Sequence, residues 1–434
     1  PQENKKKERV KKMIKFGKWV VKFRIPILIL SFLLLIPTGI IYMNTRINYD
    51  ILSYLPGDIE TMKGQDILLD EFGTGAFSVA VIDGMQEKEI SQLEDKLKEI
   101  DHVKDVLWYG ALADISIPMD MLPDDLKDSL QNADTGSQLM IITFDTSMSA
   151  DETLDAIEEI RGLTNEQCLL SGMSAVVTDI KKICNSEVIM YVVIAAGLSA
   201  LVLALTMDSF LLPFIFLLSI GMAIVYNLGT NFIAGEISFV TQALAAVLQL
   251  AVTMDYSIFL WHSYLENQER YPDDKKRAMS HAISQTLTSV VGSSITTIAG
   301  FLAMCFMTFT LGMDLGIVMA KGVVFGVVGC VTILPAMILA MDKWIEKTRH
   351  KAIIPDLGRI GGFVTKHYWI FIILFLVIIG PAFYGQNHNQ VYYDLVGTLP
   401  DNLESVKAGN ALENDFDMAV SYTHLRAHET RGNL

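Results

Sequence analysis

The sequence has none of the motifs that mark nucleotide-driven proteins. It contains neither GxxxxGKS/T nor a GxGxxG segment placed between a strand and a helix, which argues against ATP-driven transport by this chain alone. Cysteine is scarce, with four residues in 434, and the spacing of Cys, His and acidic residues matches no metal motif. No cofactor is therefore expected. Cys168 and Cys184 fall outside the apolar runs of the chain, so a disulfide between them stays open.

Basic residues are too few for a nucleic-acid partner. The chain has 34 Lys and Arg against 49 Asp and Glu, a net charge of −15. Residues 44–186 hold 28 of the acids and 10 of the bases, so the rest of the chain holds 21 acids and 24 bases. No basic groove balances this acidity, as binding to a phosphate backbone would require. The pattern predicts an acidic soluble domain within a neutral-to-basic membrane protein.

Long apolar runs are the dominant feature. A run of about 20 apolar residues spans a hydrocarbon core about 30 Å thick. The fourth and sixth runs are long enough to tilt or to project beyond the bilayer. The first is too long for a secretory signal and precedes no clear cleavage site, so we interpret it as a retained span. The seven predicted spans are 25–43, 187–206, 209–227, 238–264, 288–310, 311–341 and 368–387.

Lys and Arg cluster between alternate spans. Residues 1–24 hold ten, residues 265–287 hold four and residues 342–367 hold six, whereas residues 228–237 hold none. Because basic residues mark the cytoplasmic side, the N-terminus is predicted to be cytoplasmic in a bacterial cell membrane. Residues 44–186 would then lie outside the cell.

This predicted extracellular domain alternates between strand and helix patterns. FSVAVI at 77–82 is rich in β-branched and apolar residues, which favours a strand, and residues 87–100 carry apolar residues at helical spacing. Further strands are predicted at 103–109 and 138–144, a helix at 150–160, and a helix at 173–186 that continues into the second span. The order β-α-β-(helix or loop)-β-α is typical of a ferredoxin-like α+β module.

Residues 17–73 repeat at 361–417, at a constant offset of 344. Matches outside the span are polar and specific: Tyr49-Asp50 falls on Tyr393-Asp394, and Glu60 on Glu404. Internal duplication is a recognised way of building transporters. The predicted unit is one span, an extracellular domain and five further spans. Its parts are a basic N-terminus at 1–24, a five-helix bundle at 187–341, a linker at 342–367, and a second copy that begins with the span 368–387 and the domain start 388–420.

The repeat also predicts that the chain is the first half of a duplicated fold. A complete second copy would extend it to roughly 690 residues by doubling the period. The match fails near residue 420, so residues 421–434 are interpreted as foreign or frame-shifted sequence, with a divergent loop as the alternative.

Asp255 is the first candidate for a functional residue. It lies in the fourth span, about ten residues or roughly 15 Å from the expected cytoplasmic mouth at 1.5 Å per residue. A carboxylate at membrane depth is costly and usually marks an ion or proton path. Desolvation disfavours the ionised form, so such a carboxyl group can bind and release a proton. The alternative is a solvated carboxylate close to the mouth.

Tyr256 follows Asp255 and shares a helix face with Gln249 and Gln242, counted back by sevens. Polar side chains on one face of a span should meet protein or water rather than lipid. Hydrogen bonding between helices and a path for a solute explain this face equally well. In the chain as given, Asp255 and this face would lack the surface of a second copy.

Other polar residues within the spans are possible accessory groups. His262 could pass protons to Asp255 or anchor the helix at the interface. Lys321 should lie roughly 10 Å from Asp255 in depth, which makes an ion pair doubtful; a snorkelling lysine is the alternative. Hydroxyl groups of the fifth span could bond to the fourth span or to their own carbonyls; they belong to Ser293, Ser294, Thr296 and Thr297. Glycines of the sixth span allow close helix contact; they are Gly322, Gly326 and Gly329.

The layout resembles the RND superfamily, and three motifs resemble its MMPL family. They are the pair Asp255-Tyr256 with Phe259, the segment TILPA at 332–336, and LPxxxE from Leu55 to Glu60. The resemblance implies a porter-type extracellular domain and export of lipids or other hydrophobic molecules. It further implies that the proton motive force drives export, with Asp255 carrying the proton and Tyr256 orienting it. In the family this pair works with a second pair in the tenth span, near position 599 at the observed offset.

Two other functions fit the same architecture. One is a sterol-sensing-like protein that binds lipid without pumping, and the other is an accessory factor for protein secretion. Pumping requires an Asp255 that titrates, whereas passive binding does not. The expected partners are membrane lipids, a hydrophobic substrate, and either the second half or another copy of the chain; no nucleic acid is expected.

The topology can be tested by cysteine labelling from outside the cell. Asp95→Cys should react with an impermeant thiol reagent in intact cells, because residue 95 lies in the predicted extracellular domain. Lys276→Cys should react only after permeabilisation, because residue 276 lies between the fourth and fifth spans. Cells carrying the unaltered chain give the background from the four native cysteines. Labelling of position 276 in intact cells would overturn the predicted topology.

Overall fold

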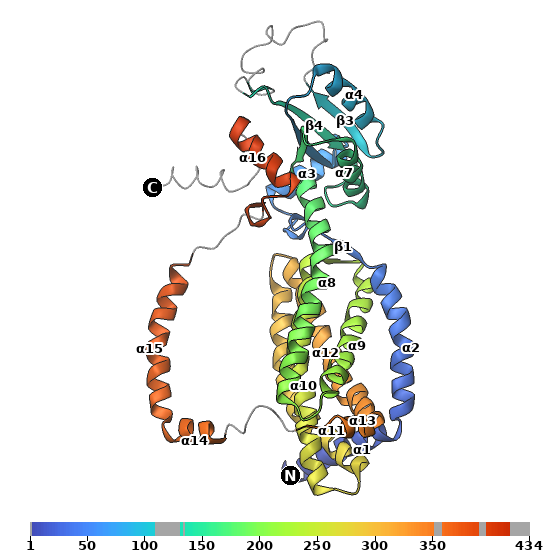
Figure 1. Ribbon diagram of the computed structural model, residues 1–434, viewed down its shortest axis with the longest axis vertical. Coiled ribbons are helices and arrows are strands. Elements are labelled where there is room, and N and C mark those ends of the chain that lie inside the picture. The colour runs from blue at the N-terminus through green and yellow to red at the C-terminus, as the bar shows by residue number, and fades with distance from the viewer. Residues whose placement is uncertain (1, 109–130, 133–134, 351–357, 390–395, 417–434) are drawn as a thin grey trace.

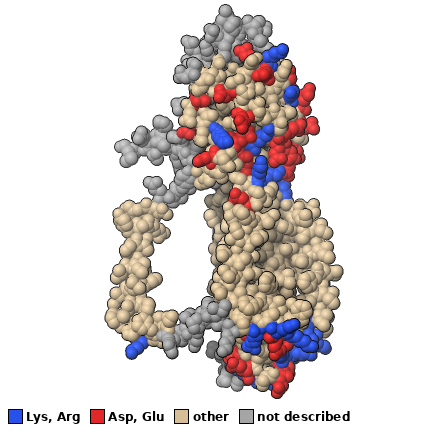
Figure 2. All heavy atoms as spheres, in the orientation of Figure 1, with Lys and Arg blue, Asp and Glu red and all other residues tan. Residues whose placement is uncertain are grey.

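The structure, a computed structural model, describes residues 2–108, 131–132, 135–350, 358–389 and 396–416. A helical bundle carries an α+β domain at one end, and a segment of the second copy follows alongside (Figure 1). Figure 2 shows Lys, Arg, Asp and Glu gathered over the α+β domain and over the opposite end, with an uncharged band between them. We call these the domain end and the basic end.

Seven of the described helices are long and apolar enough to cross a membrane. They correspond one to one with the predicted spans, because a long apolar run in a bilayer can satisfy its backbone hydrogen bonds within itself only as a helix. The main difference is in the fifth, which begins 13 residues before predicted position 288 because Asp274 caps its N-terminus. The helices are α2 (Arg24–Met43), α8 (Met173–Thr206), α9 (Leu212–Gly229), α10 (Phe239–Arg270), α11 (Lys275–Ala303), α12 (Leu311–Ala340) and α15 (Tyr368–Asn387).

Glycines of α12 set the packing of the bundle. A Cβ atom on Gly326 would overlap the Thr253 side chain of α10, and one on Gly322 would stand 2.9 Å from Gln249 Oε1. The predicted role of these glycines as close-contact points is therefore confirmed for Gly322 and Gly326. The largest core cluster surrounds this contact and includes Tyr256, Leu260 and Tyr264 of α10.

A basic helix, α1 (Gln2–Lys22), precedes the first span and was not predicted. It packs along α11, where Gly17 lies against the Ser280 carbonyl. Val20 and Val21 are buried in the bundle core, whereas Lys11, Lys12, Lys15, Lys18 and Lys22 are exposed. The chain turns at Phe23 and enters α2 directly.

The α+β domain has the predicted ferredoxin-like topology. Its four strands are antiparallel to their neighbours in the order β3 (Val103–Trp108), β4 (Gln138–Phe144), β2 (Ala76–Ile82), β5 (Cys168–Ser171). The helices α4 (Glu87–Lys98) and α7 (Asp151–Leu163) pack on one face through Ile90 and Ile157. Sequence analysis missed β5, because four residues are too few to show alternation.

Two connections hold this domain to the bundle. The helix α8 starts against the sheet and continues without a break into the second span, as predicted for residues 173–206. A short parallel pair joins β1 (Arg46–Asn48), which follows α2, to β6 (Glu236–Ser238), which precedes α10. The domain is therefore tied to three spans.

The repeat is visible in the structure. Adding 344 carries α2 onto α15 residue for residue, and carries the 3₁₀ turn Leu52–Tyr54 onto Val396–Thr398. The helices α3 (Glu60–Asp70) and α16 (Glu404–Phe416) also begin at matching positions. Their surroundings differ, because α3 has no buried residue whereas Leu412 of α16 is 2% exposed.

Helix α16 of the second copy covers the open face of the first-copy sheet. Leu412 packs against Val81 and Leu139, on the face opposite to α4 and α7. At its N-terminus, Glu404 accepts a hydrogen bond from the Leu170 amide at 3.1 Å and pairs with Arg161 at 3.3 Å. The second copy thereby completes the first α+β domain.

The cysteines are free, so the open question of a disulfide is answered negatively. Cys168 is buried in β5, and Cys184 is half-buried in α8. Burial raises the pKa of the Cys168 thiol to about 12, which leaves it protonated and unreactive at neutral pH.

The docking of α16 can be tested with Leu412→Asp. An unpaired carboxylate in this apolar contact should cost about 3–5 kcal/mol, enough to release the helix. The Leu170 amide would lose its charged acceptor and exchange roughly 10–100 times faster. Hydrogen exchange followed by mass spectrometry of the β5 peptide measures this change. Asn410→Asp places the same charge on the exposed side of α16 and should leave exchange unchanged; equal effects of both variants would contradict the docking.

Candidate functional site in the bundle

Asp255 lies at the middle of α10 and faces away from its own bundle. It follows Phe239 by 16 residues and precedes Arg270 by 15, or roughly 24 Å from either end at 1.5 Å per residue. Its side chain is exposed, on the same face as Leu248, Phe259 and His262. Within the described part of the chain, its carboxylate has no hydrogen bond or ion pair. A carboxylate is thus presented at mid-span to whatever packs on this face.

Tyr256, Gln249 and Gln242 face the opposite way, into the bundle. Gln249 Oε1 accepts a hydrogen bond from Asn227 Nδ2 of α9 at 2.9 Å. Gln242 Nε2 donates to the Tyr42 hydroxyl of α2 at 2.9 Å, and Tyr256 is 7% exposed within the core. Neighbouring helices of the same copy therefore cover this face, although Gln249 Nε2 has no hydrogen-bond partner among the described residues.

The orienting hydrogen bond from Tyr256 to Asp255 is not formed in the described structure. Successive residues of a helix are rotated by 100°, so a tyrosine packed inward directs the preceding side chain outward. Two explanations were given for the polar face, and the structure supports hydrogen bonding between helices, through Gln249 and Gln242.

The accessory residues are scattered. Lys321 Nζ donates to Asn231 Oδ1 at the end of the third span, so no ion pair with Asp255 forms, as expected from their depths. His262 is exposed on the face of Asp255, seven residues or roughly 10 Å along the axis. Three hydroxyl groups of α11 donate hydrogen bonds to carbonyls of their own helix, which is the second of the two possibilities given for them. They belong to Ser293, Thr296 and Thr297. Ser294 is buried.

A buried polar cluster lies between α9, α10 and α12, and sequence analysis missed its centre, Asn227. Among the described residues, three of its atoms have no hydrogen-bond partner: Asn227 Oδ1, Asn231 Nδ2 and Gln249 Nε2. Buried groups of this kind are normally satisfied by protein or by ordered water. An asparagine at the end of an otherwise apolar span was the available signal. The cluster can hold water inside the bundle.

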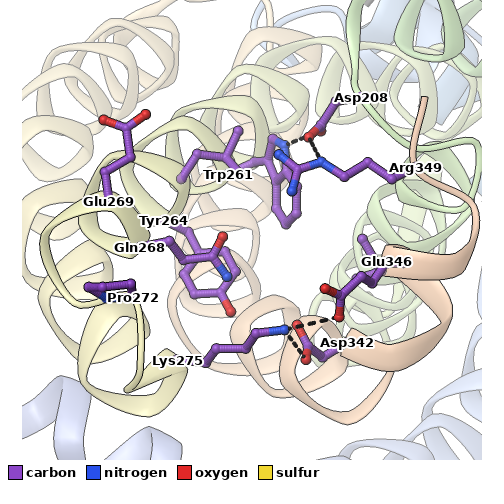
Figure 3. Close-up of a pocket in the computed structure, with 12 residues that line it drawn as sticks. Asp208, Trp261, Tyr264, Gln268, Glu269, Pro272, Lys275, Asp342, Glu346 and Arg349 are labelled. Carbon is purple, nitrogen blue, oxygen red and sulfur yellow. Dashed lines mark hydrogen bonds and ion pairs between the residues drawn. The ribbon is translucent and has the colours of Figure 1, made fainter. Parts of the chain in front are cut away.

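A polar pocket of about 380 Å³ opens at the basic end, and all of its charged residues except Glu269 form ion pairs within the described chain (Figure 3). Arg349 binds Asp208 at 3.0 Å, and Trp261 Nε1 donates to Asp208 at 2.9 Å. On the other side Lys275 binds Asp342 at 2.8 Å and reaches Glu346 at 3.3 Å. These bonds join the 207–211 loop, α10, α11 and the short helix α13 (Asp342–Lys347). The pocket suits water and ions better than an apolar solute.

The sequence profile of the MMPL family matches residues 73–367. The chain is similar to the "Probable transport protein MmpL12" of Mycobacterium tuberculosis, at 24% identity over 368 residues, which cover 81% of this chain and 30% of that protein. It is also similar to the "Putative membrane protein YdgH" of Bacillus subtilis, at 22% identity, covering 83% of this chain and 41% of that protein. The chain therefore spans less than half the length of these relatives.

Among solved structures, the chain is similar to the crystal structure of SecDF in its super-membrane-facing form. The TM-score is 0.40 at 13% sequence identity, and the match covers 75% of this chain and 39% of that one.

The buried amide pair can be tested by a double-mutant cycle. Gln249→Leu leaves Asn227 Nδ2 buried without an acceptor, which should lower the free energy of unfolding by about 1–3 kcal/mol. Adding Asn227→Leu removes the stranded donor, so the double variant should be less destabilised than the two single changes summed. Unfolding in mild detergent, followed by tryptophan fluorescence, gives all four values. Strict additivity would show that the two side chains do not interact.

Proposed function

Because the chain belongs to the MMPL family, we propose that it forms part of a secondary transporter that the proton gradient drives. The proposed cargo is a lipid or another hydrophobic molecule, exported across a bacterial cell membrane. The chain is a multi-pass membrane protein with seven candidate spans. The basic end would face the cytoplasm, in line with the rule that basic residues stay inside, and the α+β domain would face outward.

The position of Asp255 carries this proposal. A charged carboxylate at the centre of a span costs roughly 2.5–3.5 kcal/mol on insertion scales. In general, lipid around a carboxyl group favours its neutral form, and water or a polar partner favours its ionised form. A change in what covers the exposed face of α10 would therefore change proton binding at Asp255. That coupling between helix packing and protonation is what a proton-driven transporter requires.

Tyr256 would act by positioning. Its ring is held in the bundle core, and this fixes the rotation of α10 so that Asp255 emerges on the outer face. His262 lies seven residues nearer the basic end, on the same face of α10 as Asp255. The polar pocket at the basic end lies on another face of α10, because Trp261, which lines it, is packed in the bundle core.

The surface that covers Asp255 would come from a second bundle. The second copy is present in its first span and in α16, and transporters of this kind place their sites where two copies meet. No residue of α15 is buried, and Figure 1 draws it apart from the first bundle. The complete second copy, or another copy of this chain, would fill this role. The α+β domain would receive the substrate.

Asp255→Asn tests the relay in the complete transporter that contains this chain. The amide matches the carboxyl in size and hydrogen bonding but cannot titrate, so proton-coupled transport should fall by about 100-fold or more. The measurement is transport in liposomes with an internal pH dye and an imposed proton gradient.

Glu266→Gln is the matched control. It removes a carboxylate from the same exposed face of α10 beyond its membrane-spanning part, and it should leave the rate unchanged. An Asp255→Asn variant with the parent's rate and pH dependence would contradict proton coupling and favour a lipid-binding or secretion-accessory role.

A further inference from the structure

A second pocket at the basic end has a different electrostatic character. Its volume is about 560 Å³, and it lies where the end of α1, the start of α2 and the N-terminus of α11 meet. Five of its lining residues are basic and one is acidic, a net of four positive charges. The basic residues are Lys18, Lys22, Arg24, Lys276 and Arg277, and the acidic residue is Asp274. We call this the basic pocket.

The charges of the basic pocket are not neutralised within the described chain. None of its five basic side chains takes part in an ion pair; Arg24 bonds only to the Val21 carbonyl, at 3.2 Å. The guanidinium of Arg277 stacks over the Tyr271 ring at 4.4 Å. Asp274 is already engaged, since Asp274 Oδ1 accepts the Arg277 amide as the cap of α11. At the same end of the molecule, Lys275 and Arg349 are both paired with carboxylates.

Unpaired like charges that converge on one cavity repel each other unless an anion joins them. The N-terminus of α11 adds the positive end of a helix dipole to the same place. An anion with several oxygen acceptors would bind here, and a phosphate group fits that description. A headgroup that also carries an ammonium would bring a further positive charge to a pocket that already has five basic residues and one carboxylate, that of Asp274.

The setting of the pocket favours a lipid as the source of the phosphate. The basic pocket lies at the junction between α1, which is amphipathic, and α2, which spans the membrane. Directly beyond the pocket, α2 exposes an apolar surface, with Ile25 57% and Ile29 63% exposed. Trp19 is 50% exposed beside it, and exposed tryptophan is typical of the membrane interface. A phosphate in the pocket would place acyl chains along α2.

We propose that the basic pocket binds the phosphate headgroup of an anionic phospholipid. The lipid phosphate would offset part of the net positive charge of the pocket and hold the α1–α2 junction against α11. Basic pockets between spans are a known way of recognising anionic headgroups. This inference concerns a lipid that stays bound, and it stands whether or not Asp255 carries protons.

The test is native mass spectrometry of the purified chain titrated with phosphatidylglycerol or phosphatidylcholine. The unaltered chain should retain phosphatidylglycerol at least about tenfold more tightly. The triple variant Lys18→Gln, Lys22→Gln, Arg277→Gln should lose this preference. A control triple variant removes the same charge from α1 outside the pocket, through Lys11→Gln, Lys12→Gln and Lys15→Gln, and should keep it.

Each alternative has its own outcome. Equal loss of preference in both triple variants would show diffuse surface attraction and overturn the proposal, as would an unchanged preference in the pocket variant. Displacement of the lipid by millimolar inorganic phosphate would show that a soluble anion occupies the site. Lys18→Arg with Lys22→Arg keeps the charge and should keep the preference, which separates loss of charge from misfolding.

Discussion

The close approach of α12 to α10 is the contact on which the rest of the bundle depends. Gly322 and Gly326 have no side chains, so Gln249 and Thr253 of α10 can lie directly against the α12 backbone. This approach fixes the rotation of α10 about its axis. The amides and Tyr256 then turn inward, and Asp255 turns outward. One pair of small residues thereby decides which polar groups are satisfied within the first copy and which one faces beyond it.

Much of the fold follows from simple constraints. A hydrocarbon layer requires long apolar helices, so the spans and their number were predictable, as were the ferredoxin-like elements with clear periodicity. The strand β5 was not predictable, because CLLS is too short to alternate and owes its position to pairing with β2. Helix α1 was missed because lysine is its most frequent residue, and its few apolar residues acquire a role only through the contact with α11.

The sequence indicated which residues to consider as the candidate site, but it did not predict to which side of α10 their side chains point. The depth of Asp255 and the shared face of Gln242, Gln249 and Tyr256 followed from counting along a helix. Whether that face points into the bundle depends on which neighbouring helix can accommodate its side chains. Here α12 does so, because Gly322 and Gly326 have no side chains. Asn227 escaped notice for the same reason: a single amide in an apolar span gains significance only when Gln249 lies beside it.

Because α16 docks on it, the first α+β domain can be completed only late in the synthesis of the chain. The Leu170 amide and its acceptor Glu404 are separated by 234 residues in the chain. At common rates of translation the ribosome needs roughly ten to fifty seconds to cover that distance. During this interval the strands of the sheet have been made with Val81 and Leu139 uncovered, while six further spans are still being inserted. The nascent domain would pass through a stage in which its bare face is open to chaperones or to the α16 of a neighbouring chain.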